Sequence, residues 1–239
     1  MDIDLEAAAK YPMQSEDWLK TIGIGGVLML LSIFIVPIFL LYGYFVRVLR
    51  AGMREEREPP AFGDWGSLLS EGFWAFVVIF VYQLIPLIVF AVTVGGSVLA
   101  MAGGGRAGAG VGVAGLLGGM TISALLALVF GYVGLVGVAN YAHGGSLGDG
   151  FDFGVIKRVG LSWDYAVPWV VGVVAMFVAG AIASILGIVP IIGAIAGVFV
   201  TFYGYVVAGK IWGQGYADAL GLASPDAGTS EPGTSPSVD

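Results

Sequence analysis

Few side chains in this 239-residue chain could do chemistry. There is no cysteine and one histidine, His143, so the chain offers no thiolate, no disulfide and no site that needs two histidines. Asp149 and Asp152, with Asp164 further along, form the nearest thing to a carboxylate group; we interpret them as a solvated acidic loop in preference to a cation site. We therefore expect no metal, no cofactor and no catalytic residue, and a protein that is not an enzyme.

A polar side chain inside an apolar run is a second kind of candidate, because polar groups within a membrane are functional candidates by default. Gln83 lies in such a run, and Asn140 lies near the end of another. The structural alternative for Gln83 is a hydrogen bond to a carbonyl that Pro86 leaves free. We favour the structural interpretation and keep Gln83 as a possible intramembrane polar site.

Tyrosines in a recurring aromatic-Gly-Tyr triplet are the remaining candidates. The triplets are Tyr42-Gly43-Tyr44, Phe130-Gly131-Tyr132 and Tyr203-Gly204-Tyr205. The first two belong to a longer similarity at an offset of 88 residues, which also pairs an interfacial loop motif, Asp64-Trp65-Gly66, with Asp152-Phe153-Gly154. Eight positions in residues 37–72 are identical at this offset, where roughly three would match by chance. We interpret the similarity as a duplicated two-helix unit with parallel copies; the alternatives are coincidence in a glycine-rich chain and tyrosines that only pack or lie at the interface.

The elements that must position these residues are long apolar segments. Hydrophobic residues make up 58% of the chain and charged residues 11%, too few to build a water-facing surface around it. Residues 22–46 carry no charge and are followed by four arginines within eleven residues. About 20 apolar residues in a helix cross a bilayer core of roughly 30 Å. We predict an all-α, polytopic transmembrane helical bundle over residues 21–220, with spans near 22–50, 73–94, 112–139, 165–187 and 191–212.

Polar and glycine-rich segments separate the predicted spans. Residues 1–20 form an amphipathic segment whose acidic start is unlike a secretory signal. The polar loops at 51–72 and 140–164 contain short amphipathic helices that we expect at the interface. The centre of residues 95–119, rich in Gly and Ala, is expected to be a flexible external loop, and residues 221–239 a disordered acidic tail.

Cations set the predicted orientation in the cytoplasmic membrane. With five crossings, seven Lys and Arg residues fall on the side of the two polar loops and three on the other side. The positive-inside rule then favours an outside N-terminus and a cytoplasmic C-terminus. A re-entrant first or third segment would flip one end.

Glycine is abundant, with 40 residues. Gly103-Gly104-Gly105 follows no strand and lacks a Gly-Lys-Ser/Thr ending, so a phosphate loop is not indicated. Spacings such as Gly193-x-x-x-Gly197 and Gly209-x-x-x-Gly213 are typical of close helix packing, within the chain or in a homo-oligomer. The partners expected are the lipid bilayer and further copies of the chain; a net charge of −7 argues against nucleic acid.

Several motifs carry a resemblance to a known family. They are Tyr11-Pro12, Asp17 to Thr21, Ile24-Gly25-Gly26, Pro37, Tyr42-Gly43-Tyr44, Arg47, Arg50 and Pro59 to Gly66. In them the chain resembles archaeal, largely haloarchaeal, multi-pass membrane proteins catalogued as domain of unknown function 4013, and the likeness extends over residues 11–220. It departs in the Gly-rich loop 140–150, where a more charged segment is expected. The resemblance implies an archaeal cytoplasmic membrane and a high-salt interior, and no activity.

Two functions remain open. The first is a non-catalytic membrane scaffold or membrane-organising protein, indicated by abundant small residues and little buried polar chemistry. The alternative is a transporter or channel for a small, weakly polar solute, indicated by the repeat, by Gln83 and by prolines within the apolar runs.

Overall fold

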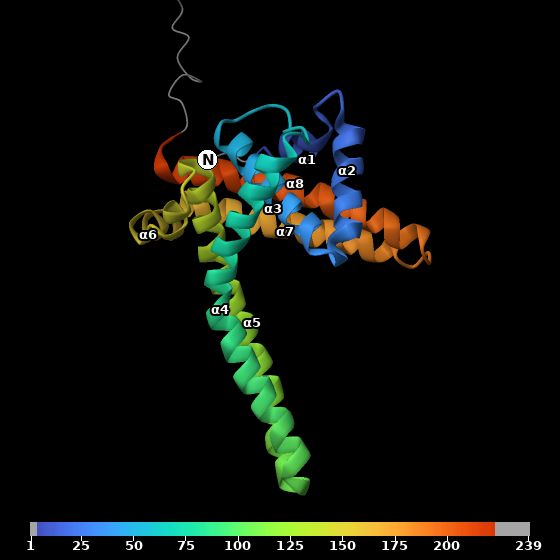
Figure 1. The fold of residues 1–239 in the computed structure, drawn as a ribbon, viewed down its shortest axis with the longest axis vertical. Coiled ribbons are helices and arrows are strands. Elements are labelled where there is room, and N and C mark those ends of the chain that lie inside the picture. Colours follow the sequence, from blue (N-terminus) through green and yellow to red (C-terminus); the bar gives the residue numbers. More distant parts are fainter. Residues whose placement is uncertain (1–3, 223–239) are drawn as a thin grey trace, which may run out of the picture.

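The computed structural model describes residues 4–222 of the chain (Figure 1). Every regular element in this range is helical, so the prediction of an all-α chain is confirmed. The elements are α1 (Leu5–Lys10), η1 (Tyr11–Met13), α2 (Trp18–Leu30), η2 (Leu31–Ile33), α3 (Ile35–Met53), α4 (Trp65–Gly103), α5 (Gly105–Gly144), η3 (Leu147–Phe151), α6 (Phe153–Gly160), α7 (Trp163–Leu186) and α8 (Ile192–Leu220). The tail predicted at 221–239 lies outside the described residues from 223 onward.

The long helices form two antiparallel hairpins, α4–α5 and α7–α8, whose partners pack along one another. The hairpins meet at one end of the molecule and diverge away from it, α4–α5 running down and α7–α8 running across the view of Figure 1. Helix α3 lies where they meet and contacts α4, α5 and α8. Because the hairpins diverge, much of each one is uncovered by the rest of the chain.

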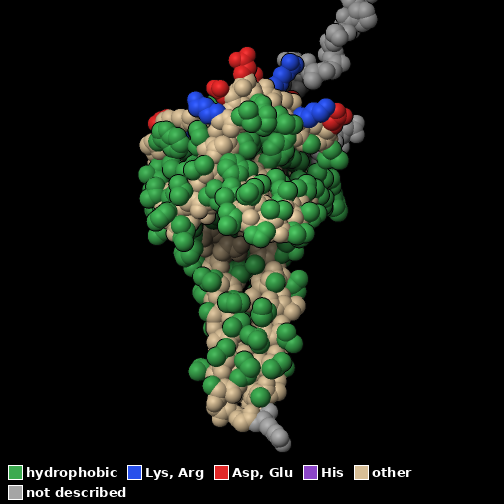
Figure 2. Space-filling model, turned by 90° about the vertical axis from the view of Figure 1, so that its right-hand side faces the viewer, with side chains coloured by type: hydrophobic (Ala, Val, Ile, Leu, Met, Phe, Trp, Pro, Cys, Tyr) green, Lys and Arg blue, Asp and Glu red, His purple; other side chains and the backbone are tan. Residues whose placement is uncertain are grey.

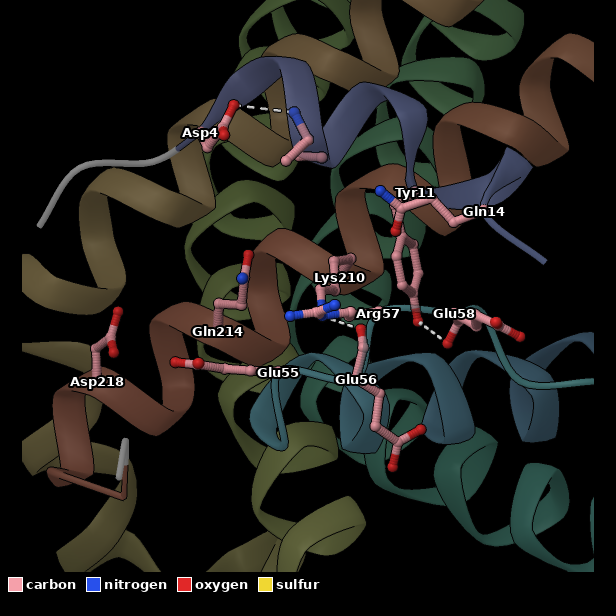
Figure 3. A pocket seen from close by; sticks show the side chains of 12 residues that line it. Asp4, Tyr11, Gln14, Glu55, Glu56, Arg57, Glu58, Lys210, Gln214 and Asp218 are labelled. Atoms are coloured by element: carbon pink, nitrogen blue, oxygen red, sulfur yellow. Dashed lines mark hydrogen bonds between the residues drawn. The ribbon is translucent and has the colours of Figure 1, made fainter. Parts of the chain in front are cut away.

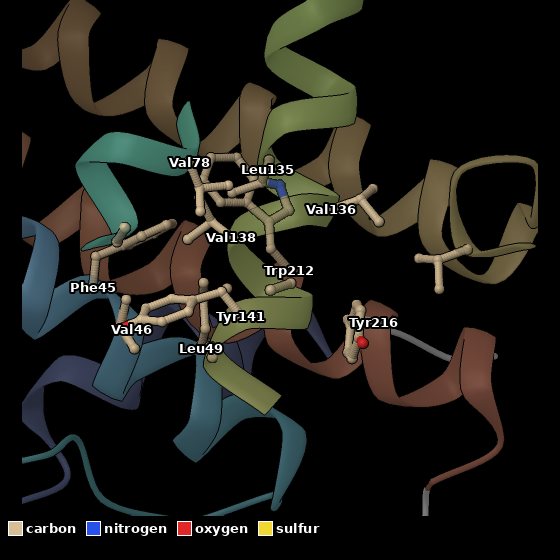
Figure 4. Packing of buried hydrophobic residues seen from close by; sticks show 14 of the residues in the cluster. Phe45, Val46, Leu49, Val78, Leu135, Val136, Val138, Tyr141, Trp212 and Tyr216 are labelled. Atoms are coloured by element: carbon tan, nitrogen blue, oxygen red, sulfur yellow. The ribbon is translucent and has the colours of Figure 1, made fainter. Parts of the chain in front are cut away.

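The largest apolar cluster surrounds the C-terminal half of α3 (Figure 4). Phe45 and Leu49 of α3 belong to it with Val78 of α4, Val136 of α5 and Trp212 of α8. Leu49, Val78 and Val136 are fully buried, so α3 joins both hairpins through side chains that meet here. This core lies at the end where the hairpins meet.

Glycines let the backbone of α3 contact the backbones of two neighbouring helices, α4 and α8. A Cβ at Gly43 or Gly72 would collide with the backbone of the facing helix, which places α3 and α4 in direct contact at this pair. A Cβ at Gly52 of α3 would lie 3.0 Å from the Cα of Gly213 in α8. Small residues at such crossings allow the close packing that holds membrane helices together.

The span expected near residues 22–50 is two helices instead of one. The chain is extended at Phe34, with φ −93° and ψ 143°, and α3 restarts at Ile35 with Pro37 in its first turn, where the missing N–H is not needed. The 13 residues of α2 rise about 20 Å, too short to cross a bilayer core. Helices α2 and α3 fold back on one another. The hydroxyl of Tyr11, a residue before α2, donates to the carbonyl of Glu58, a residue after α3 (3.1 Å).

Because α2 and α3 fold back on one another, the described N-terminal segment lies near the C-terminal part of α8. The Tyr203 hydroxyl of α8 donates to the carbonyl of Ala9, and Asp4 and Asp218 line the same cavity. The described N-terminal segment thus lies beside the last turns of α8. Five complete crossings would have placed the two on opposite sides.

Residues 95–119, expected to contain a flexible loop, are helical apart from a break at Gly104. Helices α4 and α5 therefore extend well beyond the spans expected near 73–94 and 112–139. Facing small residues explain the close pairing: a Cβ at Gly112 would lie 2.7 Å from the carbonyl oxygen of Ser97, and one at Gly119 would lie 2.5 Å from the Thr93 hydroxyl. In lipid each backbone group must be satisfied internally, which favours helix even in a glycine-rich segment.

Candidate functional site

Charged side chains gather at the end where the hairpins meet (Figure 2). We call this part, residues 4–20, 47–71, 145–164 and 210–222, the charged end. The described segments outside the charged end, residues 21–46, 72–144 and 165–209, contain one charged residue, Arg106. A polar site must therefore either lie at the charged end or consist of isolated polar side chains along the hairpins.

Two arginines of α3 tie three helices together at the charged end. Arg50 Nη1 lies 2.8 Å from Glu71 Oε1 of α4, and Arg50 Nε donates to the carbonyl of Ala142 in α5 (2.7 Å). Arg47 Nη1 donates to the carbonyl of Gly63 (2.7 Å), and its Nε lies 3.5 Å from Glu71 Oε2. These bonds orient the loop that precedes α4, which is a structural role.

The acidic residues singled out in residues 149–164 lie at the N-termini of helices, where Asp149 and Asp152 cap them. Asp149 Oδ2 accepts from the N–H of Ser146 (2.9 Å), and Asp152 Oδ1 accepts from the N–H of Gly154 (2.8 Å) at the start of α6. Asp164 lies in the first turn of α7 and accepts from the hydroxyl of Ser162 (3.2 Å). In residues 4–222 no group of three or more His, Cys, Asp or Glu is placed to hold a metal ion.

Asn140 joins α5, α8 and η3. Its Oδ1 accepts from the Tyr216 hydroxyl (2.6 Å), and its Nδ2 donates to the carbonyl of Asp149 (2.6 Å). His143 is exposed, with its ring centroid 6.0 Å from that of Tyr216. Asn140 is therefore satisfied within the chain, and His143 lies at the surface beside it.

The repeated triplets have different surroundings. Tyr44 stacks on Phe62 with ring centroids 4.1 Å apart, whereas the Tyr132 hydroxyl donates to the carbonyl of Gly160 (2.8 Å). Tyr205 packs against Phe45, and Tyr203 reaches Ala9. Gly43 and Gly204 lie at close helix contacts, while Gly131 has only the Gln83 amide nearby. The triplets do not come together as one site.

The paired loop motifs share a local role. Asp64 precedes α4 and accepts from the N–H of Ser67, and Asp152 precedes α6 and accepts from the N–H groups that open that helix. Trp65 and Phe153, which follow, are both exposed. The copies then differ, because α4 continues through Gly72 while α6 ends at Gly160.

A polar cavity of about 640 Å³ opens at the charged end, between α1, the loop after α3, and α8 (Figure 3). Lys210 of α8 lies at its base, 7% exposed, and its Nζ donates to the carbonyl of Glu56 (2.7 Å). The same ammonium lies 4.8 Å from the centre of the Tyr11 ring, a cation–π contact. Burial and, to a lesser extent, the charge of Glu56 raise the pKa of the Tyr11 hydroxyl, which stays protonated and donates to Glu58.

These contacts give Lys210 a structural role. Its ammonium satisfies the carbonyl of Glu56, in the turn that follows α3, and lies 3.5 Å from the carbonyl of Ala51 in the last turn of that helix. Lysine is favourable at such a helix C-terminus because it binds free carbonyls and opposes the helix dipole. The sequence alone does not single out Lys210, because no spacing links it to Glu56, 154 residues away.

Gln83 lies in a groove of about 490 Å³ between α4 and α5, in the apolar part of the hairpin. Among the described residues, its Oε1 has no hydrogen-bond partner, and neither has the Oγ of Ser123 across the groove. The expected bond from Gln83 to a carbonyl freed by Pro86 is not among the hydrogen bonds of the described chain. An unpartnered buried polar group costs about 1–3 kcal/mol, so this pair is the candidate intramembrane site. Ser123 carries no sequence signal beyond being a serine in an apolar helix.

The five long apolar helices and the single charged end are those of a multi-pass helical membrane protein. A family model described as protein of unknown function (DUF4013) matches residues 27–189, which is more than half of the chain. The protein belongs to this family, which is the one its motifs resemble. No curated protein and no solved structure matches the chain.

Proposed function

We propose that this protein is a non-catalytic integral membrane protein that organises the bilayer or assembles other membrane proteins. The observation that carries the proposal is the pair of diverging hairpins. In the most apolar stretch of α7, 11% of the residues are buried within the chain, and in that of α4, 22%. A single copy thus offers wide apolar faces to lipid and to neighbouring proteins, while its polar contacts are concentrated at the charged end.

A second copy of the chain is the first partner to consider. Gly96 and Gly118 lie on exposed faces of the α4–α5 hairpin, and a Cβ at either would meet nothing within 4 Å. Glycines that are open in the monomer and lie at membrane depth suit a close approach by another helix. We propose no nucleic-acid partner, since the net charge is −7.

Cation placement supports an orientation. With α2 and α3 as a re-entrant pair, nine of the ten Lys and Arg residues fall at the charged end, Arg106 being the exception. The positive-inside rule then favours a cytoplasmic charged end, with residues 4–20 and 210–222 on that side of an archaeal cytoplasmic membrane. The outside N-terminus expected from five crossings is replaced by this proposal. Cysteines introduced at Lys10 and Gly103 and labelled by an impermeant maleimide test it; labelling of position 10 from outside would contradict it.

Self-association is tested by native mass spectrometry and crosslinking in lipid nanodiscs. The wild-type chain is expected as an oligomer, and Gly96→Leu with Gly118→Leu is expected to shift it to monomer. The matched control is Gly66→Leu, which adds the same side chain at an equally open position at the charged end. A strictly monomeric wild-type chain without co-purifying lipid or protein would contradict the scaffold proposal.

Facilitated diffusion of a small, weakly polar solute is the second candidate, and the unpartnered amide oxygen of Gln83, in the groove that Pro86 also lines, favours it. Solute flux into liposomes is the measurement. Flux that is absent, or equal in the wild type and Gln83→Leu, removes this candidate without affecting the first.

A further inference from the structure

The groove between α4 and α5 has the dimensions of a ligand site. Its volume of about 490 Å³ lies within the range of small-molecule pockets, roughly 300–1,000 Å³. Pro86 lines it on α4, and Ala124 and Ala127 line it on α5, so short side chains leave the space open. Phe90 and Met120 complete apolar walls that suit a hydrocarbon body.

The hydroxyl of Ser123 differs from the other Ser and Thr hydroxyls in the apolar part of α4 and α5. Thr93, Ser97 and Thr121 each donate to the carbonyl four residues earlier, at 2.7, 2.6 and 2.9 Å. Ser123 makes no such bond within residues 4–222, although it is 5% exposed. With the Oε1 of Gln83, the residues that line the groove therefore include one hydroxyl and one amide carbonyl oxygen that are buried and have no hydrogen-bond partner within residues 4–222.

The pairing of the hairpin sets the separation of these groups. Gly119 contacts Thr93, so in this antiparallel pair Ser123 lies across from residues 89–90. Those residues are about two helical turns from Gln83, or roughly 10 Å along the hairpin. Because both atoms are buried, a molecule that hydrogen-bonds at either end of the groove must displace the side chains that cover them, while its body lies along the apolar walls between.

We propose that the groove binds an uncharged, mostly hydrocarbon molecule that carries hydroxyl or carbonyl oxygens, such as a long-chain alcohol. Among the described residues, no ionisable side chain lines it, so a charged head group would lie unpaired in a low-dielectric site. A phospholipid head group belongs at the interface. The proposal does not depend on the scaffold role, because a monomer and an oligomer both contain the groove.

Photocrosslinking in phosphatidylcholine nanodiscs tests the proposal. The probes are a diazirine-bearing hexadecanol and the matching hexadecane without the hydroxyl. The alcohol is expected to label residues 79–94 and 116–131 at least about fivefold more than the alkane, since only it can bond the free polar groups. Combining Gln83→Leu with Ser123→Ala is expected to lower alcohol labelling to the alkane level. Ser184→Ala, whose hydroxyl is bonded to Gly180, is the control and should leave labelling unchanged.

A groove-filling variant covers the case in which the double variant fails to fold, as judged by size exclusion and circular dichroism. Ala127→Leu keeps both polar groups and is expected to abolish alcohol labelling. Equal labelling by alcohol and alkane, labelling that survives either folded variant, or labelling spread evenly over α7 and α8 would overturn the proposal. Competition by added lysophospholipid as strong as by unlabelled hexadecanol would also overturn it, because the groove would then be an ordinary lipid contact.

Discussion

The crossing of α3 and α8 offers the sharpest test of the packing, through Gly52→Ala. The new Cβ would lie 2.6 Å from the carbonyl oxygen of Lys210 and 3.0 Å from the Cα of Gly213. Ordinary contact begins near 3.4 Å, so the helices must separate by about 0.8 Å, and backbone atoms cannot rotate away. Such overpacking costs about 1–3 kcal/mol. Separation would also stretch the bonds of Lys210 to the carbonyl of Ala51, in the last turn of α3, and to that of Glu56, which follows the helix.

Reversible unfolding in mixed dodecylphosphocholine and sodium dodecyl sulfate micelles, followed by circular dichroism, measures the loss. The matched control is Gly23→Ala in α2, where the added Cβ meets nothing within 4 Å. Alanine there is expected to be neutral or to stabilise by up to about 1 kcal/mol, since glycine is the poorer helix former. The two variants thus differ in sign. Equal free energies of unfolding for Gly52→Ala and Gly23→Ala would refute the close crossing.

Two further substitutions test the polar contacts of the charged end. Tyr216→Phe removes the donor to Asn140 Oδ1 and is expected to cost about 1–3 kcal/mol by leaving a buried oxygen unpaired. A double-mutant cycle with Asn140→Ala should give a coupling energy above about 0.5 kcal/mol. Additive losses in that cycle would contradict the hydrogen bond. Glu71→Gln removes the carboxylate that Arg50 contacts at 2.8 Å; it is expected to cost about 1–2 kcal/mol in the same unfolding assay. Glu6→Gln, which breaks the exposed i,i+4 pair of Glu6 with Lys10 in α1, should stay within about 0.5 kcal/mol. Equal losses for Glu71→Gln and Glu6→Gln would show that Glu71 is no more important than a surface charge.

Individual contacts show where sequence reasoning about the candidate sites reached its limit. The polarity of Gln83 is enough to single it out from the sequence. Its unpartnered oxygen, and that of Ser123 in the same groove, depend on how α4 and α5 face each other. The capping roles of Asp149 and Asp152 are local and fit the interpretation as an acidic loop. The position of Lys210 under Tyr11 is set by a contact between chain ends, about 200 residues apart in sequence.

The sequence by itself determined the helical class, the long apolar segments and the gathering of charge into a few segments. These are local properties, because hydropathy and charge along a segment decide whether it can lie in lipid. Only the tertiary structure decided that the first apolar run breaks at Phe34. An uncharged run is compatible with one helix or two, and here α2 is held against α8, where Gly25 and Gly26 contact Phe202 and Phe199. That distant packing folds α2 back along α3 and brings the two described ends of the chain to the same side.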